Sequence, residues 1–368
     1  MSTIVVKIGS NILTESARGL NQKRINSIAA DIAEVCDAGH DVVIVSSGAI
    51  AAGMEKMGLT EKPREVRLKQ AAAAAGQSSL MRAFEKAFQR HDKKVAQVLL
   101  TRGVVSFRPT YLNSRNTLNT LLEYKLIPIV NENDTVATDE LKFGDNDQLA
   151  AIVAGLIDAN RLIILSDVEG VYTADPKKDR AAKIIPRVTE ISSGLKSICG
   201  GVGSSVGLGG MYSKILAAEK ATSFGIPVNI VSGAKKGIVS SIMKGVQHGT
   251  EFIAKKKSMN SRKGWIAYAV KPGGTLILDQ GAVNAVLKGG KSLLPSGVLS
   301  IEGSFGRDEA VFCADNAGNR IAKGIVNYSS EELEKIKGSK TADIEKILGS
   351  KRQDEVIHRD DLVVMQIG

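Results

Sequence analysis

Apolar and polar positions along the first 250 residues predict strands and helices in turn. Short apolar runs rich in valine and isoleucine predict buried strands at 4–6, 41–45, 95–100, 128–130, 161–165 and 227–231. Segments with apolar residues at helical spacing alternate with them, at 22–38, 65–90, 110–124, 149–156, 215–221 and 238–246. This order predicts β-α-β units, a class of fold in which ligands bind at the carboxyl ends of the strands.

The pattern changes after the lysine run at 255–257. Short strand candidates separated by glycine-rich turns follow, at 265–270, 275–279, 298–303, 310–314 and 321–328. They predict a small all-β module with few helices, whose tail begins with a charged helix at about 330–337. We therefore expect a first domain over 1–255, a linker over 256–263, and a β domain with a C-terminal tail over 264–368.

The net charge of +10 is spread along the chain. Residues 1–255 carry 32 basic and 25 acidic side chains, and residues 256–368 carry 17 and 14. A spread excess of this kind can steer anionic ligands such as nucleotides toward the surface. It does not form a basic arm typical of nucleic-acid binding, and we interpret the run at 255–257 as a solvated linker.

Membrane and disulfide signals are absent from the sequence. No apolar run approaches the ~20 residues of a membrane helix, and the N-terminal segment leads directly into a strand without a signal-peptide pattern. Cys36, Cys199 and Cys313 lie far apart and show no metal-ligand spacing. We therefore expect reduced thiols, a cytoplasmic location and no contact with a membrane.

Residues 128–150 hold the densest polar pattern of the chain. The cluster Asn131 to Asp134 follows a predicted strand, and the cluster Gly144 to Asp147 opens a predicted helix, with a hairpin expected over 135–143. Turn formation and helix capping usually explain either cluster alone. Two clusters facing one sheet edge instead favour a ligand site.

Four other turns at predicted strand ends carry groups suited to phosphate. Lys7 to Ser10 offer an ammonium and backbone N–H groups, and the small residues at 46–53 open a helix. A polar exit follows at 166–176, and the glycine-rich stretch 200–214 leads into a helix that carries Lys214. The alternatives are an exposed lysine at Lys7 to Ser10, tight helix–sheet packing at 46–53 and a flexible linker at 200–214.

Standard nucleotide motifs do not fit the sequence. The nearest P-loop match, at 285–292, lacks its first glycine, and the glycine-rich stretch 200–214 contains no GxGxxG. If the chain binds ATP, it does so by another design.

Taken in order, the segments VVKIGS, SSGAIAAG, NENDTVA, GDND, SDVEGVYTADP and GGMYSK resemble the bacterial glutamate 5-kinases of the amino acid kinase family. The β module resembles the PUA domain that many of these enzymes carry. This combination is not the pattern of aspartokinases, carbamate kinases or uridylate kinases, and it covers essentially the whole chain. The resemblance implies a three-layer α/β/α sandwich on a mainly parallel open sheet, followed by a small all-β PUA domain.

The resemblance also implies a reaction and its partners. The expected reaction is ATP-dependent phosphorylation of the γ-carboxylate of L-glutamate to γ-glutamyl phosphate, the first step of proline biosynthesis, with feedback inhibition by L-proline. Mg²⁺ is expected with ATP, although the residues that bind the metal are not indicated. A homotetramer and a transient contact with glutamyl phosphate reductase are further expectations.

The resemblance also implies site residues, which lie at the positions of these motifs. The implied glutamate site consists of Ser47, Gly48, Asp134 and Asn146. The implied ATP site consists of Lys7, Gly9, Ser166, Asp167, Leu208, Gly209, Gly210, Met211, Tyr212, Ser213 and Lys214. Leu208 stands where the family usually has threonine, so a hydroxyl contact to the nucleotide is lost there while the backbone N–H groups remain.

The chemistry of the reaction agrees with these roles. A carboxylate nucleophile is already ionised and needs no general base, but its repulsion from phosphate must be cancelled and the reactants aligned. We assign Lys7 and Lys214 to the transferring phosphoryl group and Asp147 to orienting both ammonium groups. Asp145 is a further candidate for this cluster.

Two functions from other classes compete with this interpretation. PUA domains often bind RNA, but an RNA-binding protein would need a concentrated basic face, which the charge distribution does not provide. The second alternative is a different small-molecule kinase on the same fold.

Overall fold

The computed structural model describes residues 2–15, 19–137, 146–176, 179–198, 210–254, 261–268 and 270–365. The chain divides into two compact units, Met1–Ser258 and Met259–Gly368. Within the described residues, no helix is both long enough and apolar enough to cross a membrane.

The first unit is built on an eight-stranded sheet in the order β3-β4-β2-β1-β5-β7-β8-β6. Its strands are β1 (Thr3–Ile8), β2 (Asp41–Ser46), β3 (Lys94–Leu100), β4 (Leu126–Glu132), β5 (Arg161–Ser166), β6 (Arg187–Val188), β7 (Val228–Ser232) and β8 (Thr250–Phe252). The six strands from β3 to β7 run parallel, and β8 lies antiparallel to β7. This topology confirms the mainly parallel open sheet and all six strands predicted for this part of the chain.

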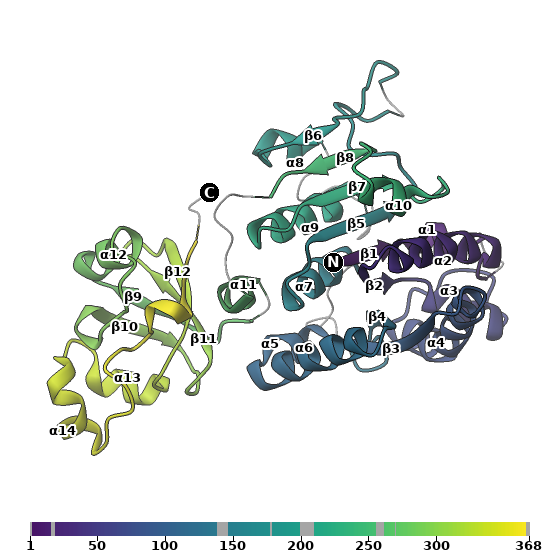
Figure 1. Ribbon diagram of the computed structural model, residues 1–368. Helices are drawn as coiled ribbons and strands as arrows, with labels where there is room; N and C mark the ends of the chain where they lie inside the picture. The colour runs from purple at the N-terminus through teal and green to yellow at the C-terminus, as the bar shows by residue number, and fades with distance from the viewer. Residues whose placement is uncertain are drawn as a thin grey trace. The chain divides into compact units, whose positions relative to one another are not determined.

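Helices cover both faces of this sheet (Figure 1). They are α1 (Ser10–Leu13), α2 (Gln22–Asp37), α3 (Ala49–Lys56), α4 (Val66–Gln89), α5 (Arg102–Ser106), α6 (Arg108–Glu123), α7 (Asn146–Leu156), α8 (Ser193–Ile198), α9 (Met211–Ser223) and α10 (Ile238–Met243). Apolar residues of α2, α4 and α10 form one core with the sheet. Helices α6, α7 and α9 pack against β4, β1 and β7 respectively.

Side chains of β1 alternate between the two helix-covered faces of the sheet. Ile4, Val6 and Ile8 are buried in the core with α2, α4 and α10. Because successive side chains of a strand point to opposite faces, Lys7 points toward the layer of α7. The sequence alternation thus directs one lysine away from the apolar core and toward a helix that carries a carboxylate.

Two glycines let α3 and α4 cross in direct backbone contact. A Cβ atom on Gly53 would lie 1.7 Å from the carbonyl oxygen of Ala72, and one on Gly76 would lie 1.9 Å from that of Ala49. Neither position can hold a larger residue without separating the helices. The crossing holds the middle of α4 against the start of α3, which follows directly on the carboxyl end of β2.

The second unit has a five-stranded sheet in the order β10-β9-β11-β12-β13. Its elements are β9 (Gly274–Leu278), β10 (Val298–Gly303), β11 (Ala310–Ala314), β12 (Arg320–Ile325), β13 (Leu362–Val364), α11 (Ser261–Tyr268), α12 (Gln280–Leu287), α13 (Ser330–Ile336) and α14 (Ile344–Leu348), with short 3-10 turns at Pro295–Gly297, Thr341–Asp343 and Arg359–Asp361. The sheet packs its apolar side chains with α12, α13 and α14 into a core separate from that of the first unit. The charged helix predicted at 330–337 is confirmed as α13.

The strand predicted at 265–270 is wrong, because residues up to Tyr268 belong to helix α11. Aromatic and β-branched residues favoured a strand locally, but tertiary contacts decide the outcome. Trp265 and Ile266 are both buried, which the alternation of a surface strand would not allow. The ammonium of Lys323 on β12 donates to the carbonyl oxygens of Ala267 and Val270 at the end of the helix, and this capping favours the helical form.

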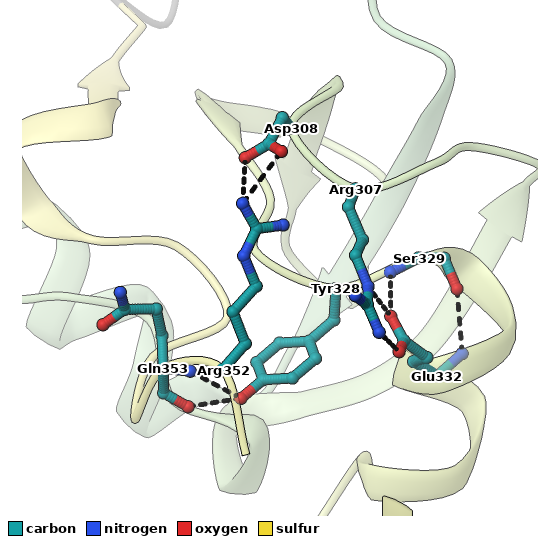
Figure 2. A network of polar contacts seen from close by, with 7 residues as sticks. All are labelled: Arg307, Asp308, Tyr328, Ser329, Glu332, Arg352 and Gln353. Carbon is teal, nitrogen blue, oxygen red and sulfur yellow. Dashed lines mark hydrogen bonds and ion pairs between the residues drawn. The ribbon is translucent and has the colours of Figure 1, made fainter. Parts of the chain in front are cut away.

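A network of charged groups ties α13 to neighbouring loops of the second unit (Figure 2). Arg307 binds both carboxylate oxygens of Glu332, and Arg352 binds both oxygens of Asp308. Glu332 also accepts from the backbone N–H of Ser329, completing a capping box at the start of α13. The pKa of Glu332 falls to about 2, chiefly because of its hydrogen bonds from Arg307.

Candidate active site

The predicted site residues that the structure describes gather at the carboxyl edge of the sheet in the first unit. Lys7 lies near the end of β1, Ser47 and Gly48 follow β2, and Ser166 ends β5. Asn146 and Asp147 begin α7, while Met211 to Lys214 form the first turn of α9. Parallel strands bring these ends to one edge, the usual ligand site of this class of fold.

A buried cluster of three charges lies at the centre of this edge. The ammonium of Lys7 is 2.6 Å from Oδ1 of Asp147, and the ammonium of Lys214 is 3.1 Å from Oδ2. The exposed fractions are 3% for Lys7, 0% for Asp147 and 6% for Lys214. Burial raises the pKa of Asp147, but the charges of the two lysines and their hydrogen bonds more than offset this effect, so the pKa falls below its usual value. The three buried side chains therefore comprise one carboxylate that contacts two lysines.

Three consecutive residues at the start of α7 organise the surroundings of this cluster. Asn146 reaches toward the end of β2, Asp147 binds the two lysines, and Gln148 donates to the carbonyl oxygen of Ser213 at 3.2 Å. The last contact holds the first turn of α7 against the first turn of α9. Lys214 is thereby placed beside Asp147, although 67 positions separate the two residues in the sequence.

The side of the site next to β2 is polar, and the side-chain amide of Asn146 connects its groups. Nδ2 of Asn146 lies 2.7 Å from the carbonyl oxygen of Ser46, 3.0 Å from Oγ of Ser47 and 3.0 Å from Oδ1 of Asn131. Gly48 has φ +104°, a conformation that residues with a Cβ rarely adopt, and it precedes the N-terminus of α3. Asp134 is half-buried in the turn that follows β4.

The side next to β5 carries a second ordered carboxylate. Asp167 accepts hydrogen bonds from Nδ2 of Asn11 at 2.9 Å and from the hydroxyl of Ser166 at 3.1 Å. The hydrogen bond from Asn11 is the largest cause of the lowered pKa of Asp167. A Cβ on Gly9 would lie 3.8 Å from the ammonium of Lys7, so the glycine leaves room beside that group. Gly9 and Ser166 thus flank the charged cluster on this side.

Some predicted positions lie outside the described residues. These are Leu208 and Gly209 of the glycine-rich loop, Asp145, and residues 138–143 of the expected hairpin. Gly210 is described as the residue that precedes α9, with Met211, Tyr212 and Ser213 following in its first turn.

Four polar residues at this edge were not predicted as site residues. Asn131 was part of a recognised polar cluster, and its role follows only from its contact with Asn146. Asn11 directly follows the Lys7 to Ser10 turn, and Gln148 follows Asp147, so proximity in sequence was a usable signal for both. Gln77 lies in an alanine-rich helix, where only its polarity and the preceding Gly76 distinguish it.

The described residues offer few groups for a metal ion. Within the described part of the chain, no group of three or more His, Cys, Asp or Glu side chains could hold a metal ion. The carboxylate at the centre of the site, Asp147, is occupied on both oxygens by lysines. Mg²⁺ in phosphoryl-transfer sites is commonly held by one or two carboxylates together with substrate phosphates, an arrangement that requires no such group.

The chain matches known protein families and relatives over most of its length. A sequence model of the amino acid kinase family matches residues 2–232, and a model of the PUA domain matches residues 274–348. A glutamate 5-kinase of Geobacter sulfurreducens is 48% identical over 362 residues, covering 98% of this chain and 97% of that protein. One of Caldanaerobacter subterraneus subsp. tengcongensis is 48% identical over 365 residues, covering 99% and 98%. The solved carbamate kinase of Giardia lamblia bound to AMP-PNP has a TM-score of 0.52 at 17% identity, covers 69% of this chain and 99% of that protein, and supports the fold alone.

The fold, the charged cluster and the matching sequence model define a kinase of the amino acid kinase family, to which the chain belongs. The glutamate 5-kinases with a C-terminal PUA domain are the branch in which it falls, because such relatives match it at 48% identity over nearly its full length.

Proposed function

We propose that the cluster of Lys7, Asp147 and Lys214 neutralises the transferring phosphoryl group when ATP phosphorylates the γ-carboxylate of L-glutamate. The single observation that carries this proposal is the burial of two ammonium groups on one carboxylate at the carboxyl edge of the sheet. Asp147 holds both lysines in place, and their excess positive charge matches the charge that develops on phosphoryl oxygens. Because the acceptor is an ionised carboxylate, no residue has to remove a proton from it.

The acceptor side is proposed to consist of Ser47, Gly48, Asp134 and Asn146. The backbone N–H groups at the start of α3 and the amide of Asn146 can bind the α-carboxylate and α-ammonium groups of glutamate. Asp134, as a half-buried carboxylate at the same edge, is suited to pair with the α-ammonium group. The γ-carboxylate then points toward the lysine cluster, because Asp147 adjoins Asn146 in α7.

The nucleotide side is proposed to lie between the exit of β5 and the start of α9. Gly9, Ser166 and Asp167 line one side, and Gly210 to Lys214 line the other, with Leu208 and Gly209 preceding them in sequence. Helix α9 has 13 residues, and its N-terminus favours phosphate through its backbone N–H groups and dipole.

Mg²⁺ is proposed to enter with ATP, bound mainly to phosphate oxygens, where it supplies further charge neutralisation. Lys7 and Lys214 remain the protein's own contribution to charge at the reacting group.

We propose further properties on the basis of the family to which the chain belongs. L-Proline shares the α-carboxylate, α-nitrogen and stereochemistry of glutamate but lacks the γ-carboxylate, so it is proposed to inhibit by competing at the acceptor side. A cytoplasmic location, a homotetramer and a transient contact with glutamyl phosphate reductase are proposed on the resemblance alone. RNA binding is not favoured, because residues 259–368 carry 15 basic and 14 acidic side chains.

The purified chain with ATP, Mg²⁺ and hydroxylamine tests this function. Hydroxylamine attacks an acyl phosphate, releasing inorganic phosphate and forming a hydroxamate that can be measured by its colour with iron. We expect hydroxamate with glutamate and none with aspartate or carbamate. Product with another acceptor and none with glutamate would assign the chain to a different kinase. Initial rates over a grid of proline and glutamate concentrations test the inhibition, which glutamate should relieve.

A further inference from the structure

Gln77 lies on α4 at the point where this helix touches the start of α3. The preceding residue, Gly76, makes the backbone contact with Ala49 that brings the two helices together. Ala49 is the first residue of α3 and follows Gly48 directly. The helix crossing therefore delivers the side chain of Gln77 to the acceptor side of the site, although α4 contributes none of the residues predicted for that site.

A relay of amide groups connects Gln77 to the acceptor side. Oε1 of Gln77 accepts from Nδ2 of Asn131 at 3.0 Å. Oδ1 of Asn131 accepts from Nδ2 of Asn146 at 3.0 Å and from the backbone N–H of Glu132 at 2.9 Å. Asn131 thus has both its oxygen and its nitrogen assigned by its neighbours, and it links Gln77 on α4 to Asn146 on α7.

Gln77 makes its hydrogen bond through its side-chain oxygen, Oε1, which accepts from Asn131. Its Nε2 atom is buried and has no hydrogen-bond partner among the described residues. A buried donor without an acceptor is unfavourable, and native structures keep few of them. The side chain therefore gains its polar interaction as an acceptor for Asn131.

We propose that Gln77 is a positioning residue that sets the affinity for the amino-acid substrate by holding Asn131 and, through it, Asn146. Without the oxygen of Gln77, Nδ2 of Asn131 loses its acceptor, and the side chain loses one of the contacts that fix its rotamer. Asn146 then loses one of the acceptors that direct its Nδ2 toward the end of β2, and its amide no longer presents one fixed face to the substrate. The inference rests on the proposed function, because it assigns the acceptor side to glutamate.

Gln77→Met tests the proposal, because methionine has a similar length and removes the oxygen. We expect the glutamate KM to rise about fivefold to thirtyfold, the factor that corresponds to about 1–2 kcal/mol, while the ATP KM changes less than twofold. Gln89→Met makes the same chemical change at an exposed position of the same helix and should leave both KM values unchanged. If Gln77→Met does not fold, Gln77→Leu removes the same oxygen with a different shape.

A double-mutant cycle separates positioning from general packing. If Gln77 acts through Asn131, Gln77→Met should have no further effect on the glutamate KM in an Asn131→Ala background. Additive effects, an equal rise in both KM values, or an unchanged glutamate KM would each overturn the proposal. Failure of the wild-type chain to form hydroxamate from glutamate would instead overturn the proposed function, so the two failures are distinguishable.

Discussion

Each unit of the molecule contains a group of linked charges, and the two groups differ in their exposure to water. In the first unit, Lys7, Asp147 and Lys214 are almost completely buried. In the second unit, the network in Figure 2 pairs Arg307 with Glu332, which are 49% and 19% exposed, and Arg352 with Asp308, which are 40% and 64% exposed. Ion pairs between a basic side chain and a carboxylate therefore occur both buried and partly exposed to water within one chain.

This difference in environment separates a group that we propose supports chemistry from one that supports folding. Removing charges from water costs several kcal/mol per ion, and the attraction between them often fails to repay that cost. Two lysines that share one carboxylate are an unfavourable arrangement for stability alone, but they create a strong positive field for an anion in a region of low dielectric. The exposed pairs incur little desolvation and each add at most about 1 kcal/mol.

Asp147→Asn is the change with the largest expected effect, because it removes the carboxylate that two buried lysines contact. We expect a loss of about 3–5 kcal/mol in the free energy of unfolding at pH 7, measured by urea denaturation, and a large loss of kcat. ATP should restore part of the stability, because its phosphates supply negative charge to the lysines.

Asp37→Asn provides the exposed control. Asp37 pairs with Lys93, and its side chain is 66% exposed, so this variant should lose at most about 1 kcal/mol. Equal losses for the two variants would mean that burial does not distinguish the charges as we infer.

Lys214→Ala should lower kcat by about 10²–10³-fold, equivalent to about 2.7–4 kcal/mol, and change both KM values much less. The reason is that a lysine aimed at the transferring group acts mainly in the transition state. Steady-state rates measured by the hydroxamate assay check this. A near-normal kcat would remove Lys214 from the chemistry.

Lys323→Met is the matched control for a buried lysine outside the site. Lys323 is 5% exposed and caps α11 in the second unit. Its replacement should loosen that helix and leave kcat within about twofold of wild type, because it belongs to none of the elements that form the site.

Asp134→Ala should affect one substrate and not the other. Loss of a carboxylate that pairs with the α-ammonium group should raise the glutamate KM by about 10–100-fold, as expected for a charged hydrogen bond worth about 1.5–3 kcal/mol. The ATP KM should stay within a few-fold. Equal changes in both constants would make the carboxylate structural.

The same contrast explains how much could be predicted from sequence. The strands and long helices followed from apolar periodicity, and the charged cluster combines polar residues near a strand end and at a helix start, as with Lys7 and Asp147. Both signals can be recognised within a short stretch of sequence. The resemblance to known kinases then assigned roles to residues far apart in the chain.

The parts that could not be predicted depend on contacts between distant segments. Gln77 reaches the site only because Gly53 and Gly76 let two helices cross closely. Helix α11 forms where local preference favoured a strand, because Lys323 caps it from a strand more than fifty residues away. Periodicity carries no information on either contact.

Glu332→Gln should give the smallest effect and shows what a partly exposed ion pair contributes. The folded-state pKa of Glu332 is about 2, chiefly because Arg307 donates hydrogen bonds to it, whereas an unfolded glutamate has a pKa of about 4.3. A lowered pKa means that this stabilisation is complete above about pH 4.3 and is lost as the pH falls toward 2. The variant should therefore lose about 0.2–1 kcal/mol at pH 7, and its difference from wild type should narrow at pH 3.

The chain has one tryptophan, and Trp265 is buried in the second unit, so urea unfolding followed by its fluorescence reports on that unit. Glu331→Gln is the control, because it removes a charge from the same first turn of α13 without removing the pair with Arg307. A difference between Glu332→Gln and wild type that stays constant from pH 7 to pH 3 would show that the ion pair contributes nothing. The loss would then come from the helix end, and the contrast with the buried cluster would rest on the first unit alone.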